Sequence, residues 1–551
     1  MLILALACTG APDISQPLVT PADSSPDAAP TEAWPGGTPQ LLVMLRKNLL
    51  VDEQLAESMD IVDRAAAAGY TGVVVADFKL NLVHTGELSD TYDEHLGQLV
   101  ERIEGHGMVT IPAVLPFGYS EGILRSDPNL AEGQPIVGLP LTVREDGGLT
   151  PSSGELVSGG DFSSGLDGWS WWDEEVSADD GAARIDAGSG NARLVQTLAV
   201  EPHRQLQLSL RVKTEGFSAD WWNVMLYDVE AERSRNHTGW SIASDQDWTP
   251  YDVAVNTGDS DSLSLYLGAW GGHSGTAWID DVSVRETAPV NLLRRPGAPL
   301  TVTREGIELV EGVDLNELVD PMLGIDGSYD DWHTPVEIAA IDGGALSPGD
   351  RVTLDYYAVA PIDGYQVGAC LTEPDTHVWI EGNLAAVVER FPNTPALFSQ
   401  HDEMRHMNTC AACAVQGRDA GELLASHMGD ISGAVDAALP GARLMVWSDM
   451  FDPNHNAHDD YYLVEGDVSG SWEGLGEDVL IVNWLHSPES LAWFDERGHP
   501  QILAGFYDAS DGAEAAASER TDAGGIELAG MMYTTWTDDY TQLESYATGA
   551  R

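Results

Sequence analysis

The feature that most constrains the fold of this chain is an alternation of short apolar segments with amphipathic segments near its beginning. Residues 41–45, 72–77 and 108–117 are almost continuously apolar, as strands buried on both faces are. Residues 52–68 and 92–105, which separate them, have the apolar periodicity of helices. Strands connected in this way run parallel and are covered by helices on both sides.

The same alternation resumes after residue 374, where helical patterns at 375–391 and 421–439 accompany further apolar segments. These segments are 396–400, 443–447, 479–484, 501–507 and 529–536. Three strands before the gap and five after it make eight, the number that closes a (β/α)8 barrel. An open doubly wound sheet is the alternative, but it would need a glycine-rich loop after the first strand, where the chain has Leu45-Arg46-Lys47-Asn48. We therefore predict an α/β fold, a TIM barrel built from residues 40–150 and 366–551.

Between the two halves the helical period disappears. Short alternating segments such as 206–212, 263–267 and 278–284 follow one another with turn-forming residues between them. This pattern predicts an inserted antiparallel jelly-roll sandwich at 151–288. Residues 289–365 continue with β-like segments, and we expect a small extra β region that returns the chain to the barrel.

The charge balance limits the possible partners. Aspartate and glutamate total 89 against 26 lysines and arginines, and the formal net charge is −63. A surface of this sign repels polyanions, so we expect no nucleic-acid partner.

The first residues have the pattern of a targeting segment. Ala5-Leu6-Ala7-Cys8 resembles a bacterial lipobox, in which the cysteine is lipidated, and residues 9–38 have the Pro, Ala, Ser and Thr content of a disordered tether. We expect residues 1–39 to be a lipoprotein signal and linker. The protein would then be exported, as a periplasmic or outer-surface lipoprotein or an extracellular protein, and would meet the membrane only through a lipid on Cys8. A fortuitous apolar start is the alternative.

Metal-binding patterns are incomplete in this sequence. Cys410 and Cys413 have the spacing of half a zinc motif, and no second half follows, so we expect a disulfide or local clip, no metal and no cofactor. Histidines also gather after two of the expected strands, which leaves a metal-dependent sugar-modifying enzyme as a weaker alternative. They are His401, His406, His455 and His458.

Carboxylates, aromatic rings and one arginine follow nearly every strand expected in the barrel. In such barrels the active site lies at the carboxyl ends of the strands. Carboxylates bind sugar hydroxyls and tryptophans stack on the apolar faces of sugar rings, so the set predicts a carbohydrate pocket. Taken singly, each aspartate could be a helix N-cap and each tryptophan a core residue. The candidates are Arg46, Asp77, His401, Asp402, Glu403, Trp447, Asp449, Trp484, Tyr507, Asp508, Trp536 and Asp538.

Several of these residues stand in motifs that resemble family 20 glycoside hydrolases, the β-N-acetylhexosaminidase type. The motifs are Leu371-Thr-Glu-Pro-Asp-Thr376, Val388-Glu-Arg-Phe-Pro392, Ser399-Gln-His-Asp-Glu-Met-Arg405 and Trp447-Ser-Asp-Met-Phe-Asp-Pro453. The last two, together with the insert, are similar to a poorly characterised bacterial group of glycosidase-like lipoproteins. The resemblance implies a secreted glycosidase acting on a poly- or oligosaccharide.

The resemblance also implies roles for individual residues. Glu403 would be the general acid/base, and Asp402 would orient a substrate 2-acetamido group that Tyr507 also binds. Arg46 would hold ring hydroxyls, while Trp447 and Trp536 would wall the pocket. A retaining mechanism that pairs Glu403 with Asp449 or Asp538 at about 5–5.5 Å is the competing chemistry. A glycan-binding lipoprotein on a degenerate, non-catalytic barrel is the competing function.

The insert has its own resemblance. Gly160-Asp-Phe162, Gly168-Trp169 and Trp278-Ile-Asp-Asp-Val-Ser-Val284 are similar to the opening and closing motifs of family 4, 9 and 22 carbohydrate-binding modules. Four tryptophans could stack on glycan, although the insert could instead be a structural spacer. They are Trp221, Trp222, Trp240 and Trp270.

Overall fold

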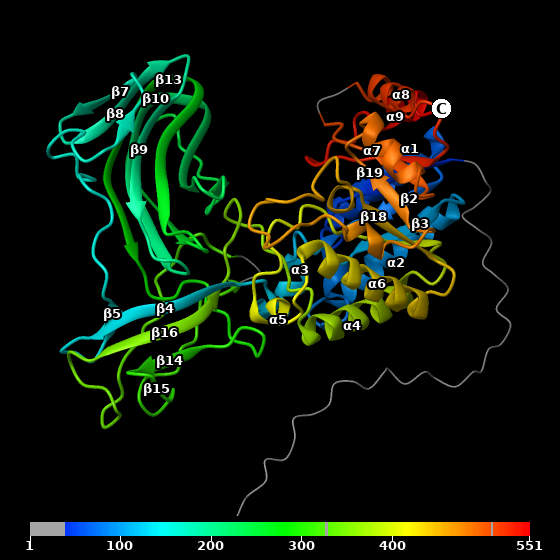
Figure 1. The fold of residues 1–551 in the computed structure, drawn as a ribbon. Coiled ribbons are helices and arrows are strands. Elements are labelled where there is room, and N and C mark those ends of the chain that lie inside the picture. The colour runs from blue at the N-terminus through cyan, green and yellow to red at the C-terminus, as the bar shows by residue number, and fades with distance from the viewer. Residues whose placement is uncertain (1–38, 326–328, 509–510) are drawn as a thin grey trace, which may run out of the picture. The chain divides into compact units, whose positions relative to one another are not determined.

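The computed structural model describes residues 39–325, 329–508 and 511–551. In it, eight parallel strands pair in the order β1-β2-β3-β17-β18-β19-β20-β21 and close into a barrel (Figure 1). The strands are β1 (Gln40–Leu45), β2 (Gly72–Val75), β3 (Val109–Val114), β17 (Ala396–Ser399), β18 (Arg443–Trp447), β19 (Leu480–Asn483), β20 (Gln501–Ala504) and β21 (Leu528–Tyr533). The predicted eight-stranded barrel in two parts is confirmed.

Closure depends on one pairing across the insertion. Phe398 and Ser399 of β17 pair with Ala113 and Val114 of β3, although the two strands are far apart in sequence. Every residue of β2 is buried, because these short strands are covered inside and outside the barrel.

Helices connect most of these strands. They are α1 (Asp52–Ala68), α2 (Asp90–Gly105), α3 (Glu121–Leu124), α4 (Pro374–Arg390), α5 (Ala411–Ala414), α6 (Ala420–Ala438), α7 (Pro488–Asp495), α8 (Gly512–Asp522) and α9 (Leu543–Gly549). The expectation of eight complete β/α units is wrong at one place. Only the 3₁₀ turns η5 (Asp449–Phe451) and η6 (Ser471–Gly474) lie between β18 and β19. That segment is rich in Asp and Gly, which disfavour a helix interior.

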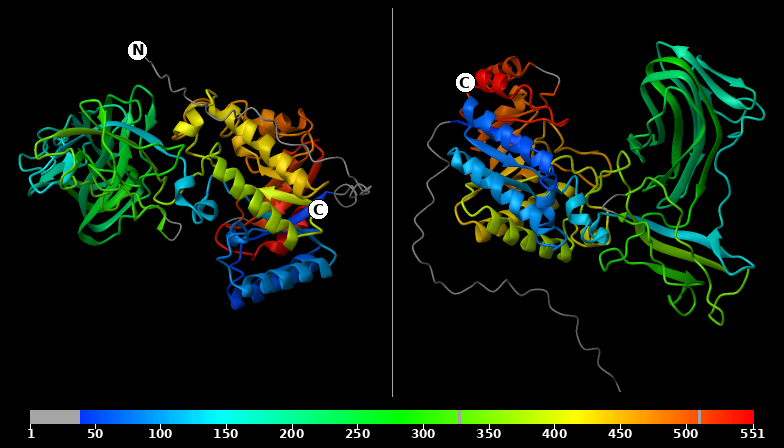
Figure 2. Two further views of the ribbon diagram at one scale, coloured as in Figure 1. Left: turned by 90° about the horizontal axis from the view of Figure 1, so that it is seen from below. Right: turned by 180° about the vertical axis from the view of Figure 1, so that it is seen from behind.

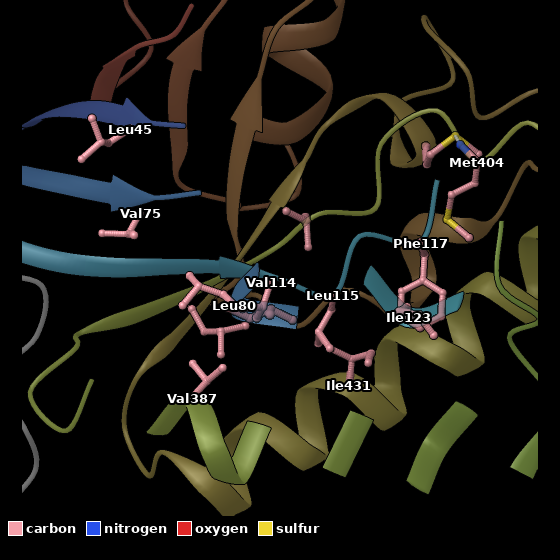
Figure 3. Packing of buried hydrophobic residues seen from close by; sticks show 14 of the residues in the cluster. Leu45, Val75, Leu80, Val114, Leu115, Phe117, Ile123, Val387, Met404 and Ile431 are labelled. Carbon is pink, nitrogen blue, oxygen red and sulfur yellow. Dashed lines mark hydrogen bonds between the residues drawn. The ribbon is translucent and has the colours of Figure 1, made fainter. Parts of the chain in front are cut away.

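One apolar core joins the barrel strands to their helices. Figure 3 shows Leu80 beside Val387 of α4, and Leu115, just after β3, beside Ile431 of α6. Helix α1 turns Leu55, Val62 and Ala65 toward this core and ends at Gly69, whose φ of 83° forms a left-handed C-cap.

The inserted region forms an antiparallel sheet of eight strands. They are β6 (Trp171–Trp172), β7 (Val176–Asp179), β8 (Ala182–Gly188), β9 (Ala192–Ala199), β10 (Gln205–Asp228), β11 (Arg233–Ser234), β12 (Gln246–Asn256) and β13 (Ser262–Glu286). Register shifts between Glu215 and Ser218, and between His273 and Thr276, interrupt the two longest strands. The halves on either side pair with different neighbours and share one apolar core, so the sheet is folded into two layers.

A smaller antiparallel sheet has the order β15-β14-β16-β4-β5. Its strands are β4 (Gln134–Val143), β5 (Leu149–Pro151), β14 (Thr301–Arg304), β15 (Ile307–Glu308) and β16 (Arg351–Ala358). Residues 134–150 therefore belong to this sheet and not to the barrel part expected at 40–150. The strand leaving the barrel pairs directly with the strand returning to it, at Gln134 and Ala358 (Figure 2).

Cys8 and the other residues of the expected signal and linker up to residue 38 lie outside the described residues. No helix within the described part of the chain has the length and apolar content that a membrane crossing requires.

Candidate active site

A pocket of about 700 Å³ opens at the carboxyl ends of the barrel strands. All eight strand ends contribute to its lining, which places it where barrel enzymes carry their active sites. The lining includes Arg46, Phe78, Tyr119, Tyr365, Asp402, Glu403, Trp447, Trp484, Phe506 and Trp536.

Two adjacent carboxylates, Asp402 and Glu403, both line this pocket. In a regular extended strand their side chains would point to opposite sides. Glu403 instead has a φ of 47°, in the left-handed region, which bends the chain just after β17. Its N–H donates to Asp449 Oδ2 over 2.8 Å, and this hydrogen bond holds the bend.

Gly118 allows the loop after β3 to approach this bend. A Cβ at Gly118 would lie 1.8 Å from the carbonyl oxygen of Asp402 and 3.0 Å from that of Glu403. No side chain fits there, so the position admits glycine alone.

The Glu403 carboxylate is held by two partners. Arg405 Nη2 forms an ion pair with Oε1 at 2.7 Å, and the Tyr119 hydroxyl donates to Oε2. Arg405 is fixed in turn by Gln366, whose Oε1 accepts from Nη1 at 2.7 Å. Gln366 Nε2 also donates to the Glu403 carbonyl oxygen at 2.7 Å. Glu403 is therefore rigidly placed as a carboxylate.

The Asp402 carboxyl group has different surroundings from that of Glu403. Among the residues that the structure describes, its carboxylate has no ion-pair partner, and its own backbone N–H donates a hydrogen bond to it. Burial, and then repulsion from the nearby Asp449 carboxylate, raise the pKa of Asp402 to about 8. At neutral pH Asp402 therefore carries a proton, and Glu403 beside it forms an ion pair.

Asp449 is not among the residues that line the pocket. It is completely buried, and its oxygens accept from the Glu403 N–H, Asn456 Nδ2 and Trp484 Nε1. Burial raises its pKa, against the effect of these hydrogen bonds. The structure thus gives Asp449 a positioning role beneath the acid pair.

Aromatic rings wall the pocket. Trp447 and Trp536 have ring centroids 6.1 Å apart, and Trp536 is 42% exposed. The Arg46 guanidinium carbon lies 4.8 Å above the Trp536 ring centroid. Asp508 does not line the pocket and instead accepts from the Trp536 N–H at 2.8 Å. Asp508 supports the tryptophan loop, which corrects our expectation that it binds sugar.

Four further candidates are not among the residues that line the pocket, so the structure does not bear out their expected contacts with substrate. Asp77 accepts from the Lys79 and Leu49 N–H groups and caps a 3₁₀ turn, η2 (Phe78–Leu82). The Tyr507 hydroxyl donates to Glu519 at 3.0 Å within the helical layer.

The other two are His401 and Asp538. His401 is buried, with Nε2 3.1 Å from His427 Nε2, and burial lowers its pKa to about 3. Asp538 faces Lys47 at 4.0 Å in a neighbouring depression.

Tyr119, Tyr365 and Phe506 were missed by the sequence reasoning. Tyr119 comes two residues after Phe117, at the end of an expected strand, and that position was the available signal. Phe506 lines the pocket in place of its neighbour Tyr507. Tyr365, which stacks near Tyr119 with centroids 6.4 Å apart, lies in the returning segment and had no local signal.

The four tryptophans proposed for the insert divide into two pairs. Trp221 and Trp270 are register partners on β10 and β13, with ring centroids 5.4 Å apart, and Trp221 is 54% exposed. Trp222 and Trp240 pack against the core of the insert. Trp171 extends the exposed pair, because Arg193 lies over both the Trp270 and Trp171 rings.

The candidate histidines do not assemble a metal site. His455 packs edge-on against Trp484 with centroids 4.4 Å apart. Within the described ranges, the one group of side chains close enough to share a metal contains no histidine.

Comparison with known proteins places these features in context. No known protein-family model matches the chain. A curated relative, exochitinase 1 of Streptomyces olivaceoviridis, is 28% identical over 196 residues. The match covers 34% of this chain and 30% of the relative, so the chain spans less than a third of that protein's length.

Among solved structures, Flavobacterium johnsoniae chitobiase matches 93% of this chain and 47% of its own at 8% identity, with a TM-score of 0.37. A family 16 carbohydrate-binding module matches 24% of this chain and 99% of its own at 20% identity, with a TM-score of 0.18. The barrel and the antiparallel sheets are established by the strand pairing of this chain itself.

Proposed function

We propose that this protein is a glycoside hydrolase whose acid pair is Asp402 and Glu403. The observation that carries the proposal is the placing of two adjacent carboxyl groups in an aromatic-walled pocket at the carboxyl ends of the barrel, Glu403 paired with Arg405 and Asp402 with its pKa raised to about 8. Glycoside cleavage needs a protonated and an ionised carboxyl group at once, one to protonate the leaving oxygen and one to meet the positive charge of the transition state.

The geometry supports a division of roles that differs from the one implied by the family resemblance. Asp402, with its pKa raised to about 8, is the proton donor to the glycosidic oxygen. Glu403, fixed by Arg405 and Tyr119, is the carboxylate that stabilises the developing charge or activates the attacking water. Asp449 holds the bend that aims both side chains at the substrate.

The aromatic walls support a pyranose as the bound group. Trp447, Trp484 and Trp536 offer flat apolar faces, and Arg46 beside Trp536 offers donors for hydroxyl groups. The name of the Streptomyces relative suggests N-acetylglucosamine polymers as the first substrates to test.

The roles can be separated by the choice of leaving group. The Asp402→Asn variant should lose about 10²–10⁴-fold in kcat on oligosaccharides. It should lose much less on dinitrophenyl glycosides, whose leaving group needs no proton. The Glu403→Gln variant should lose activity on both kinds of substrate. Asp538→Asn, outside the pocket, is the matched control and should retain wild-type rates.

Two results would contradict the proposal. Full activity of both variants on a substrate that the wild type cleaves would show that Asp402 and Glu403 are not the catalytic acid pair. Binding of glycans without turnover of any glycoside would identify the protein as a glycan-binding barrel, the alternative function considered above.

We also propose that the insert binds glycan and that the protein is exported with a lipid on Cys8. The exposed Trp221–Trp270 pair supports the first proposal, and the Ala5-Leu6-Ala7-Cys8 sequence supports the second. Loss of acyl labelling in a Cys8→Ser variant expressed in a bacterial host would test the anchor.

A further inference from the structure

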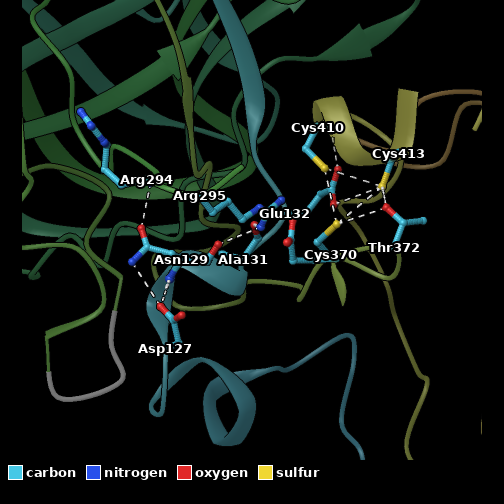
Figure 4. A network of polar contacts seen from close by, with 11 residues as sticks. Asp127, Asn129, Ala131, Glu132, Arg294, Arg295, Cys370, Thr372, Cys410 and Cys413 are labelled. Carbon is cyan, nitrogen blue, oxygen red and sulfur yellow. Dashed lines mark hydrogen bonds and ion pairs between the residues drawn. The ribbon is translucent and has the colours of Figure 1, made fainter. Parts of the chain in front are cut away.

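Three cysteines and one glutamate from distant parts of the chain meet in a buried cluster. They are Glu132, Cys370, Cys410 and Cys413, and one ligand atom from each lies within 4.8 Å of the others (Figure 4). All four side chains are buried. The proposed active site does not use them.

Four of the separations within this cluster are close to the edges of a metal-centred tetrahedron. Cys370 Sγ lies 3.4 Å from Cys410 Sγ and 3.7 Å from Cys413 Sγ, and the last two are 3.7 Å apart. Sulfurs bound to one Zn²⁺ at about 2.3 Å with tetrahedral angles are about 3.8 Å apart. Cys413 Sγ lies 3.6 Å from Glu132 Oε2, and the corresponding sulfur–oxygen edge is about 3.6 Å.

A disulfide does not account for this arrangement. Bonded sulfurs are about 2.05 Å apart, and a bond between any two of the three cysteines would leave the third thiol buried beside a glutamate. The three sulfurs are instead nearly equidistant, which is what a shared central ion requires.

Surrounding groups orient the ligand atoms toward a common centre. The N–H groups of Thr409 and Cys410 each donate to Glu132 Oε1 at 2.7 Å, which leaves Oε2 on the side of the cysteines. The Thr372 hydroxyl lies 3.2 Å from Cys413 Sγ. Such outer hydrogen bonds are typical of protein metal sites.

A buried ion pair lies beside the cluster. Arg295 Nε lies 3.1 Å from Glu373 Oε2, and the two side chains are 5% and 6% exposed. Arg295 Nη1 also donates to the Asn129 and Ala131 carbonyl oxygens at 2.8 Å each (Figure 4). Three thiolates, one carboxylate and one Zn²⁺ would leave a net charge of about −2, and the positive charge of Arg295 beside it is shared with Glu373.

We propose that Glu132, Cys370, Cys410 and Cys413 bind one structural Zn²⁺. Four protein ligands complete a tetrahedral shell and leave no position for substrate, which is typical of structural zinc. Binding releases the thiol protons to solvent.

The metal would join three segments of the barrel. Glu132 precedes β4, where the chain leaves the barrel, and Cys370 follows the returning segment that carries Tyr365 and Gln366. Cys410 and Cys413 follow the loop that carries Glu403 and Arg405. The ion would therefore clamp both ends of the inserted region to the loop that bears the acid pair.

Metal analysis of the full-length protein tests the proposal directly. The wild type, purified without chelator and desalted, should contain one zinc per chain by mass spectrometry. Replacement by Co²⁺ should produce the visible bands of a tetrahedral, thiolate-rich site. Cys413→Ser and Glu132→Gln should each reduce the zinc content at least tenfold, while Cys8→Ser, the matched control, should keep it.

Three results would overturn the assignment. One is a wild-type protein that binds less than a tenth of an equivalent of zinc after incubation with zinc sulfate. The second is a disulfide between any two of Cys370, Cys410 and Cys413 in the protein as isolated. The third is stoichiometric iron or copper in place of zinc. These measurements need no folded variant, since they are made on the wild type.

Discussion

Replacing Asp402 by asparagine should stabilise the folded protein, and by more at pH 9 than at pH 5. The pKa of Asp402 is about 8 in the folded chain, because of burial and of repulsion from Asp449. An aspartate in the unfolded chain titrates near 3.9. As the pH rises above about 4, the unfolded chain loses this proton and the folded chain keeps it, so stability falls until about pH 8 and the loss is complete above it.

The magnitude follows from the two pKa values. At about 1.4 kcal/mol per pH unit, the wild type loses about 4 kcal/mol between pH 5 and pH 9 through this group. Water in the pocket screens the carboxylate, so this figure is an upper limit. Asparagine carries no charge, and the variant should lack this loss.

Urea denaturation at pH 5, 7 and 9 measures the difference in the free energy of unfolding between wild type and Asp402→Asn. The contributions of the other titrating groups cancel in this difference. Asp508→Asn is the control of opposite sign. Burial acts to raise the pKa of Asp508, but hydrogen bonds from Thr535, Thr537 and the Trp536 N–H outweigh it and lower the pKa. Asp508→Asn should therefore cost stability at neutral pH and less as the pH falls through that lowered pKa. Equal differences between wild type and Asp402→Asn at pH 5 and pH 9 would refute the reasoning.

Three other substitutions test separate parts of the structure. Gly118→Ala should lower the free energy of unfolding by about 3 kcal/mol in thermal unfolding, because its Cβ would overlap the Asp402 carbonyl oxygen. Gly433→Ala, where the added Cβ enters open space on α6, should raise it by about 1 kcal/mol. Trp536→Ala should raise KM about tenfold on any cleaved oligosaccharide, since one stacking wall worth about 1.4 kcal/mol is lost; an unchanged KM would place the sugar elsewhere. Trp221→Ala, made in the Asp402→Asn background, should weaken retention on an insoluble glycan, and Trp248→Ala is the comparison on the same sheet.

The barrel was predictable because its strands carry a strong local signal. The apolar segment at 443–447 coincides with β18, five other barrel strands lie within the expected ranges, and β1 and β21 each begin one residue before theirs. The pairing of β4 with β16 had no such signal, because antiparallel partners on either side of a long insertion are not related by local periodicity.

The site was only partly predictable, since a shift of one residue turns a side chain to the opposite side. β20 ends at Ala504, so Phe506 lines the pocket and Tyr507 turns into the helical layer. His401 is turned away between Gln400 and Asp402 for the same reason. The left-handed backbone of Glu403, which brings it beside Asp402, is not signalled by a glycine.

The position of the insertion has a consequence for synthesis of the chain. Strand β3 cannot pair with β17 until residues 115–395, which lie between the two strands, have been synthesised. At about 5–20 residues per second this takes about 15–60 s. During that time β1–β3 have an unpaired edge, and by its end all strands of the two antiparallel sheets, β4 to β16, have been made. We expect the insert to fold first and the barrel to close last, so the unfinished barrel is the stage at which this chain is most exposed to aggregation.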